Sequence, residues 1–256
     1  MNMLDRNGHL RRQAHAAIVV AKKDVMIYYL KAPVLIFGVV FPVFFFLAFA
    51  IGRPVPIGGI VPGMLAMALF FTSSAIGPLV TPWERQAKTY ERLVTSPASI
   101  EAILSGDVLA GSAFGLAFSM VTLIIGAAAT DACIVAAAQL VIGLLLGALV
   151  FAALGVLLAA PVTTAPSQIM MLSAMVRLPL IFISGIFIPI DRMPVWARWL
   201  SPLSPLSYCT DLVRRGFGYP GYFPAWLDIL ALVVFTAVFF GMARLFHLRS
   251  RRVGNT

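Results

Sequence analysis

The residues whose side chains could do chemistry gather in one charged stretch, residues 82–107, between apolar segments that can each cross a bilayer. The charged residues that open it are Glu84, Arg85, Lys88, Glu91 and Arg92. Charged side chains are costly to place in hydrocarbon, so we predict that this stretch stands in water at one end of a helical bundle. We interpret it as a surface on which another protein acts.

The local pattern of this stretch predicts two short helices with a break between them. Apolar residues recur at helical spacing over 87–94, and Glu84 and Lys88 form a favourable pair four residues apart. Ser96 followed by Pro97 is typical of a helix N-cap with proline at the first helical position. Periodicity alone favours a solvated connector between two spans, with a docking surface as the alternative.

Motifs for nucleotide, metal and acid-base chemistry do not occur. No lysine follows a glycine, so the chain has no P-loop in which to hold ATP. His9, His15 and His247 lie near the two ends of the sequence without metal-site spacing. No aspartate pair has the helical spacing that holds Mg²⁺ in membrane enzymes. We therefore predict no catalytic residue, no metal site and no cofactor bound by this chain.

The composition is that of a polytopic membrane protein, with 61% hydrophobic and 11% charged residues. A net charge of +9 in a soluble chain would indicate nucleic-acid binding. Here the basic residues cluster at the ends of apolar segments, as topology signals do, so we exclude nucleic acid. Residues 1–31 are basic without an uninterrupted apolar core, so we predict a cytoplasmic N-terminus and no cleavable signal peptide.

Six apolar segments approach or exceed the length of about 20 residues that a bilayer core requires. They are residues 32–51, 57–80, 102–129, 134–160, 168–186 and 225–246. Both termini then lie in the cytoplasm. Before them, Ile18, Ala21 and Val25 share one helical face with Lys22 and Lys23 turned away. An interfacial helix on the inner leaflet and a helix packed against the bundle both stay open.

Small residues and one buried cation mark the spans. Gly111 with Gly115, and Gly143 with Gly147, form small-x-x-x-small pairs that indicate helix packing within the bundle or across a dimer. The charge of Arg177 carries a high free-energy cost inside a membrane unless it has an ion-pair partner or contacts water. We predict an ion pair of Arg177 with Asp107, which the helical rise places at a similar shallow depth. A site for an anionic headgroup is the alternative.

Residues 185–224 are too polar and proline-rich to span but carry many aromatic residues, so we predict that they lie half sunk in the outer leaflet. Ser204 and Pro205 predict the start of a short helix that runs toward Arg214. Cys133 and Cys209 fall on the same outer side, and we expect two separate thiols.

Two segments resemble the permeases of the ABC-2-type transporter family. Residues 84–111, ERQAKTYERLVTSPASIEAILSGDVLAG, resemble the first cytoplasmic loop of the family, with its acid-Arg, Glu-Arg-Leu, Ser/Thr-Pro and final Gly elements. Residues 184–217, SGIFIPIDRMPVWARWLSPLSPLSYCTDLVRRGF, are similar to the segment after span five, with its Ser-Gly-x-x-x-Pro, Pro-Leu-Ser-Tyr and Asp-x-x-Arg elements.

The resemblance implies an all-α polytopic membrane protein of the type V exporter kind, with six transmembrane helices and an N-terminal interfacial helix. Residues 1–31 would be the tail and interfacial helix, and 32–256 the transmembrane domain. The domain would include a coupling loop (82–107), whose coupling helix docks on an ATPase, and an outer re-entrant segment (185–224). The coupling residues would be Glu84, Arg85, Lys88, Tyr90, Glu91, Arg92, Leu93, Ser96 and Pro97. The outer gate would use Ser184, Gly185, Pro189, Trp196, Trp199, Pro205, Tyr208 and Asp211.

The resemblance also implies partners and a substrate class. Two copies of the chain, or one copy and a related permease, would pair in the inner or plasma membrane with two ABC ATPase subunits, which bind the ATP and Mg²⁺. The chain is similar to the daunorubicin-resistance and lipo-oligosaccharide branch, so we expect efflux of a lipidic, glycolipid or hydrophobic drug-like substrate. A polysaccharide export permease is one alternative. An integral membrane enzyme or a non-transporting membrane partner is the other.

Overall fold

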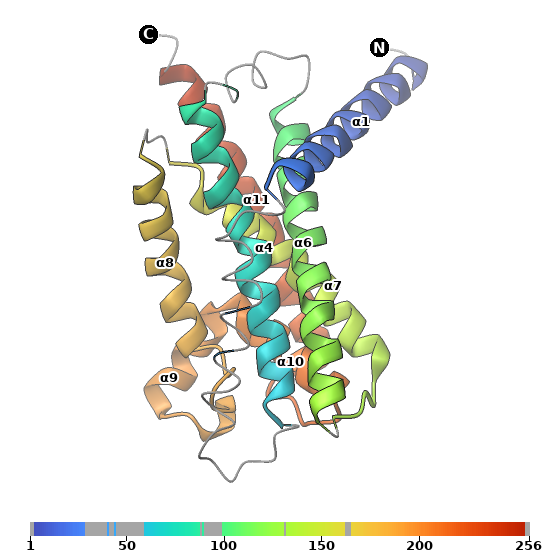
Figure 1. Cartoon of the computed structure of the whole chain (residues 1–256), viewed down its shortest axis with the longest axis vertical. Coiled ribbons are helices and arrows are strands. Elements are labelled where there is room, and N and C mark those ends of the chain that lie inside the picture. Colours follow the sequence, from blue (N-terminus) through green and yellow to red (C-terminus); the bar gives the residue numbers. More distant parts are fainter. Residues whose placement is uncertain are drawn as a thin grey trace.

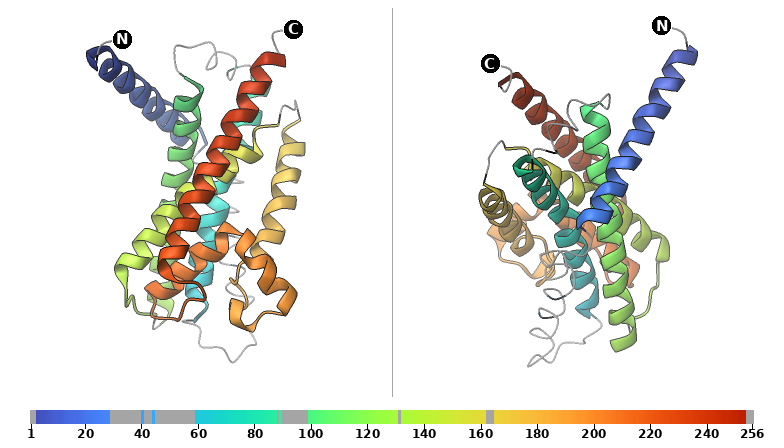
Figure 2. Two further views of the ribbon diagram at one scale, coloured as in Figure 1. Left: turned by 180° about the vertical axis from the view of Figure 1, so that it is seen from behind. Right: turned by 45° about the horizontal axis from the view of Figure 1, so that its top comes forward.

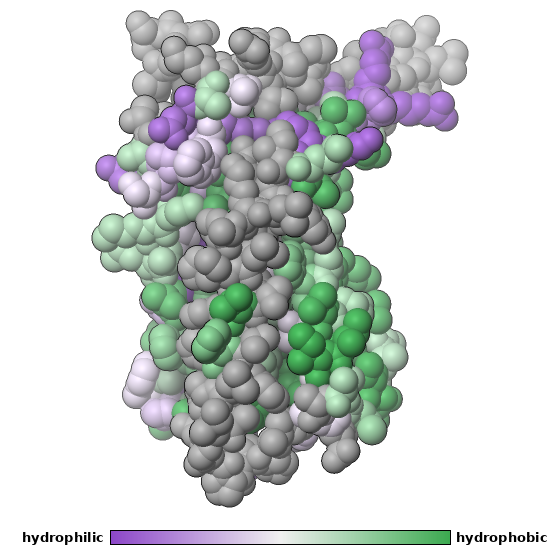
Figure 3. Space-filling model, in the orientation of Figure 1, coloured by the Kyte–Doolittle hydropathy of each residue, from purple (hydrophilic) through white to green (hydrophobic). Residues whose placement is uncertain are grey.

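The computed structural model describes residues 3–28, 40, 44, 59–87, 89, 99–130, 132–161 and 165–253. Every regular element within these residues is helical, which confirms the predicted all-helical class. The helices form an elongated bundle, and both ends of the chain lie at the same end of it (Figure 1). We call this the terminal end. Hydrophilic residues gather near the terminal end, and hydrophobic ones cover much of the body below it (Figure 3).

Four helices are long and apolar enough to cross a membrane. They are α4 (Val61–Gln86), α6 (Ile100–Ala129), α7 (Ala137–Leu158) and α11 (Ala225–Val253). A fifth apolar helix, α8 (Pro166–Phe182), has 17 residues. These five correspond to the second to sixth predicted spans. The first predicted span, residues 32–51, lies outside the described residues, so the count of six stays a prediction.

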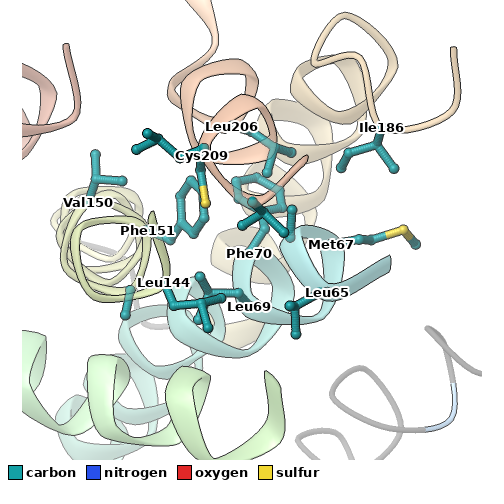
Figure 4. Packing of buried hydrophobic residues seen from close by; sticks show 14 of the residues in the cluster. Leu65, Met67, Leu69, Phe70, Leu144, Val150, Phe151, Ile186, Leu206 and Cys209 are labelled. Carbon is teal, nitrogen blue, oxygen red and sulfur yellow. The ribbon is translucent and has the colours of Figure 1, made fainter. Parts of the chain in front are cut away.

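Helix α4 is the centre of the bundle, with almost all of its residues buried. Its Phe70 ring packs edge-on against Phe151 of α7, with ring centroids 5.0 Å apart. Aliphatic side chains and Cys209 complete this contact between α4, α7 and α10 (Pro205–Gly216), as Figure 4 shows. Lipid is as apolar as these side chains, so close packing rather than water exclusion must hold the helices together.

The two predicted glycine pairs lie at such close contacts within the bundle. A Cβ atom on Gly111 would come 2.8 Å from the carbonyl oxygen of Ser73 in α4. A Cβ atom on Gly147 would come 2.6 Å from the sulfur of Cys209 in α10. A Cβ atom on Gly115 would clash with the Ser73 side chain of α4, and one on Gly143 would come 2.9 Å from Cβ of Leu212 in α10. Each glycine therefore lets two helix surfaces approach where a larger residue would separate them.

The N-terminal helix α1 (Met3–Tyr28) packs against α6 with its C-terminal half and projects away from the bundle toward its N-terminus (Figure 2). Of the predicted apolar face, Ala21 and Val25 pack against the bundle, but Ile18 does not. Ile18 is 59% exposed, whereas Ala17 and Val20 are buried against α6. Gly106 of α6 makes room for them, because a Cβ there would lie 2.7 Å from Val20. The described contacts are those of a helix packed against the bundle.

The segment after α8 forms four short elements at the end opposite the termini (Figures 1 and 2). They are η3 (Ile190–Arg192), α9 (Val195–Leu200), η4 (Ser201–Leu203) and α10. Helix α10 starts at Pro205, as predicted. Ser204 does not cap it with its side chain but donates a hydrogen bond to the carbonyl oxygen of Leu180. Gly185 makes the turn out of α8 with φ of 81°, which favours glycine.

Candidate functional site

A buried group of charged side chains joins α1, α4 and α6 toward the terminal end. We call Lys23, Asp24, Glu84 and Asp107 the terminal charged cluster. The Lys23 ammonium donates a hydrogen bond to the Glu84 carboxylate and lies 3.1 Å from Oδ1 of Asp24. Asp107 of α6 faces Asp24 across the α1–α6 contact. Lys23 is thus the one cation of a cluster with three carboxyl groups, each less than a tenth exposed.

This cluster corrects two predictions. Glu84 does not stand in water, because α4 continues through Pro82 to Gln86 and α1 covers it, leaving Glu84 7% exposed. Lys23 does not turn away from the bundle either. It is the partner of Glu84, a role for which sequence spacing favoured Lys88, which lies outside the described residues. The signal that sequence reasoning missed is a lysine next to an aspartate on the packed side of the N-terminal helix.

The charges of the cluster act on each other. Burial opposes the charged form of Lys23, but Asp24 and Glu84 outweigh that effect and raise the pKa of Lys23. Burial raises the pKa of Asp24, and the ammonium of Lys23 offsets this only in part. The Lys23 ammonium therefore stays charged at neutral pH and holds the three helices together through its acids.

Further polar contacts tie the remaining helices to the same end. Arg85 donates from Nη1 to the carbonyl oxygen of Pro161, just after α7, at 2.6 Å. Glu101, near the start of α6, accepts a hydrogen bond from Nε of Arg244 in α11 at 2.8 Å. The start of α6 is itself fixed by Ser99, whose Oγ accepts from the backbone nitrogen of Ala102 at 3.1 Å. These contacts and the terminal charged cluster join α1, α4, α6, α7 and α11.

Most of the predicted docking residues lie in the sequence between the end of α4 and the start of α6, and both of these helix ends are at the terminal end (Figure 1). The chain passes from α4 to α6 through residues 87–99, and the structure describes only 87, 89 and 99 of them. Lys88, Tyr90, Glu91, Arg92, Leu93, Ser96 and Pro97 lie outside the described residues, so their role stays a prediction. Ser99 was not predicted as a cap, although a serine before an apolar run with Glu101 in the first turn is a known cap signal.

At the opposite end, three charged residues of α10 hold the flanking segments. We call Asp211, Arg214 and Arg215 the α10 clamp. Asp211 accepts from the backbone nitrogens of Tyr222 and Phe223 at 2.9 and 2.8 Å. Arg214 donates to the carbonyl oxygen of Gly185 at 2.7 Å, and Arg215 donates to that of Phe223. One short helix thereby fixes both the turn after α8 and the chain that enters α11.

The other predicted gate residues lie in the segment from the end of α8 to α10. Tyr208 donates to the carbonyl oxygen of Pro202 at 3.1 Å, and Ser184 to that of Ile181 at 2.6 Å. Pro189 precedes η3. Trp196 and Trp199 of α9 are 65% and 79% exposed, as expected of aromatic residues at a membrane interface. Cys133 is exposed and Cys209 is buried, and both are free thiols, as expected.

We expect Asp211→Ala to loosen the chain between α10 and α11. Two backbone N–H groups lose their carboxylate acceptor, which should destabilise this segment locally by about 2 kcal/mol. Burial raises the pKa of Asp211 more than these two hydrogen bonds lower it. Limited proteolysis of the purified protein should show faster cleavage within 217–224. Asp191→Ala, a change to an exposed aspartate of η3, is the control, and equal cleavage in the two variants would contradict the prediction.

Arg177 of α8 contacts a backbone carbonyl rather than a carboxylate. Its Nη2 donates to the carbonyl oxygen of Ser74 in α4 at 2.7 Å, and the residue is 8% exposed. An α-helical carbonyl normally accepts from the nitrogen four residues later, which here is Pro78, and proline has no N–H. Arg177 therefore satisfies a carbonyl that Pro78 leaves free.

The predicted ion pair of Arg177 with Asp107 is not formed. Asp107 faces Asp24 near the start of α6. Arg177 lies eleven residues beyond Pro166, the first residue of α8, so it is deeper in the bundle than Asp107, which lies seven residues beyond Ile100. The prediction that Arg177 and Asp107 lie at a similar depth is therefore wrong.

Comparison with known proteins agrees with the two segments that resemble a family. A family model described as "ABC-2 type transporter" matches residues 17–218, from the packed half of α1 to the end of α10. A search of curated proteins finds no match to the chain. The family match covers well over half of the chain and includes both the terminal charged cluster and the α10 clamp. The chain therefore belongs to the ABC-2 type transporter family.

Proposed function

We propose that this chain is the membrane-spanning permease of an ATP-driven exporter that moves a lipidic, glycolipid or hydrophobic drug-like substrate from the cytoplasm or inner leaflet. The family match over residues 17–218 carries the proposal. ABC-2 permeases are transmembrane subunits without their own ATPase site and work with a separate ABC ATPase. We further propose that two copies of the chain pair around the pathway and that two ATPases bind below them.

The geometry of the terminal end supports a mechanical role for the coupling loop. The loop leaves from α4 next to Glu84 and Arg85, whose partners lie in α1 and just after α7. It returns at α6, where Glu101 binds Arg244 of α11. A push on the loop would therefore move five helices together, as a rigid-body tilt that shifts the population between two states of the bundle.

The location of the termini supports a cytoplasmic terminal end. The last helix carries Arg244, Arg249, Arg251 and Arg252 toward its C-terminus, and the N-terminal helix carries Arg11 and Arg12. Basic residues next to spans are retained in the cytoplasm. The C-terminal end of α4, the start of α6 and the outer ends of α1 and α11 all lie at this end, so an ATPase on the cytoplasmic side of the inner membrane would meet the segments that continue from them (Figure 2).

The test is assembly with an ATPase. The chain should co-purify with an ABC ATPase from its native membrane, and the reconstituted pair should show vanadate-sensitive ATP hydrolysis that candidate lipids or drugs stimulate. Alanine at Tyr90, Arg92 and Leu93 together should abolish co-purification. Alanine at Arg192, Leu203 and Tyr219, the same residue types near the opposite end, is the control. An ATPase that binds both triple variants equally would refute docking on the loop, and a permease without any ATPase would refute the function.

A further inference from the structure

We propose that Arg177 and Ser173 form a site in the middle of the membrane that binds the anionic headgroup of an amphiphilic substrate between α4 and α8. The inference rests on the proposed export function and names the chemical class of its substrate. The headgroup would be an oxyanion, such as a phosphate or a carboxylate, attached to an apolar tail.

The site is built on the buried stripe of α8. Ile169, Ser173, Arg177 and Ile181 are the buried residues of this helix and follow one another at four-residue spacing. Within the described part of the chain, Nε of Arg177 and Oγ of Ser173 have no hydrogen-bond partner. Both atoms are buried, and the two residues are one helical turn apart on the same face. Buried polar groups without a partner need an explanation, and a bound ligand that accepts from both of these groups would provide one.

The charge of Arg177 is the second observation. Its contact with the Ser74 carbonyl needs only a neutral donor, whereas its guanidinium is charged at any physiological pH. Among the described residues, no ion pair involves Arg177. Residues 32–51, the predicted span outside the described part, contain no aspartate or glutamate. A bound anionic ligand would supply this counter-charge.

A second copy of the chain does not supply this counter-charge at the right depth. Arg177 contacts Ser74, which lies twelve residues from the nearer end of α4, so Arg177 is close to the middle of a hydrocarbon core about 30 Å thick. The acids within the long apolar helices, Glu84, Glu101, Asp107 and Asp228, all lie within eight residues of a helix end. A ligand whose acidic group reaches the middle of the membrane matches the depth of Arg177 better than these acids do.

The position of α8 gives such a ligand access from lipid. Among the described helices, α8 packs mainly against α4 and α7, and Figure 2 shows it along one side of the bundle. Its outward face is apolar, with Met171, Met175 and Phe182 each more than 60% exposed. Methionine side chains adapt to irregular apolar partners, so this face suits varied tails. The headgroup would then pass into the α4–α8 contact and reach Arg177.

The experiment measures binding of soluble amphiphiles to the purified full-length chain without any ATPase. Dodecyl phosphate should bind at least about tenfold more tightly than dodecyl maltoside, as expected for a charge-assisted contact. Arg177→Gln keeps a donor for the Ser74 carbonyl but removes the charge, so it should abolish this preference. Arg177→Lys should retain part of it. Arg198→Gln is the matched control, because Arg198 also donates to a backbone carbonyl, that of Asp191, and its loss should leave the preference unchanged.

Two results would overturn the proposal. One is an Arg177→Gln protein that elutes as a folded species in size-exclusion chromatography and still prefers dodecyl phosphate. The other is inorganic phosphate that binds as tightly as dodecyl phosphate, which would indicate a free anion rather than an amphiphile. Binding without an ATPase separates this test from the exporter proposal. Failure to find an ATPase partner would overturn the exporter proposal but would leave the binding result unchanged.

Discussion

A Gly77→Ala variant should be strongly destabilised, because α4 and α7 cross here with their backbones in contact. The added Cβ would meet the carbonyl oxygen of Gly155 and would lie 2.7 Å from the backbone nitrogen of Val156. A backbone cannot rotate away as a side chain can, so the two helices must move apart. We expect a loss of about 3 kcal/mol from overpacking.

Thermal melting in detergent, followed by size-exclusion chromatography, measures this loss. Gly241→Ala in α11 is the matched control, since a Cβ at that position has nothing within 4 Å. It should leave the midpoint unchanged or raise it slightly, because alanine favours helix more than glycine does. Equal midpoints for the two variants would show that α4 and α7 do not cross as closely as the structure has them.

The spans could be predicted because length and apolar character are local properties of the sequence. The ends of the spans were harder to predict where a charged residue forms an ion pair with a residue distant in sequence. Helix α4 was predicted to end at residue 80, since Glu84 was expected in water, but it continues to Gln86. The reason is Lys23, which is 61 residues away in sequence and neutralises Glu84. Spacing along one chain segment cannot show such a contact.

The candidate sites show the same limit. The Asp-x-x-Arg element that resembles the family motif contains Asp211 and Arg214, so two of the three residues of the α10 clamp carry a sequence signal, whereas Arg215 was not singled out. Their partners are backbone groups of Tyr222, Phe223 and Gly185, which carry no sequence signal. Arg177 was likewise recognised as a costly cation, but its partner is a carbonyl that became available only because Pro78 lacks an N–H.

Lys23→Met should be the most damaging change to the terminal charged cluster. It leaves Asp24, Glu84 and Asp107 buried without their cation, and breaking a buried ion pair by removing one partner costs about 3 kcal/mol or more. Lys22→Met is the matched control, because the neighbouring Lys22 is exposed. A melting midpoint near that of wild type is expected for Lys22→Met and a much lower one for Lys23→Met. Equal melting midpoints for the two variants would show that the cluster does not stabilise the fold.

The pH dependence should show the origin of this loss. Burial places the pKa of Asp24 above its ordinary value of 3.8, so Asp24 reduces stability as pH rises from that value through its pKa in the folded protein. Lys23 lowers the pKa of Asp24, so its removal should extend this window upward and make the loss larger. The Lys23→Met protein should therefore recover stability at pH 5 relative to pH 7.5, whereas Lys22→Met should follow wild type. A deficit that is the same at both pH values would point to lost packing instead.

A double variant separates stability from force transmission. Lys23→Met with Glu84→Gln removes one unpaired charge along with the cation, so its two effects should not add, and part of the lost stability should return. The double variant would then be folded but would lack the ionic link between α1 and α4. If the cluster transmits motion from the coupling loop, this protein should still bind the ATPase, while its ATP hydrolysis no longer responds to substrate. Stimulation equal to wild type would mean that the cluster only stabilises the fold and that motion reaches the bundle by another contact.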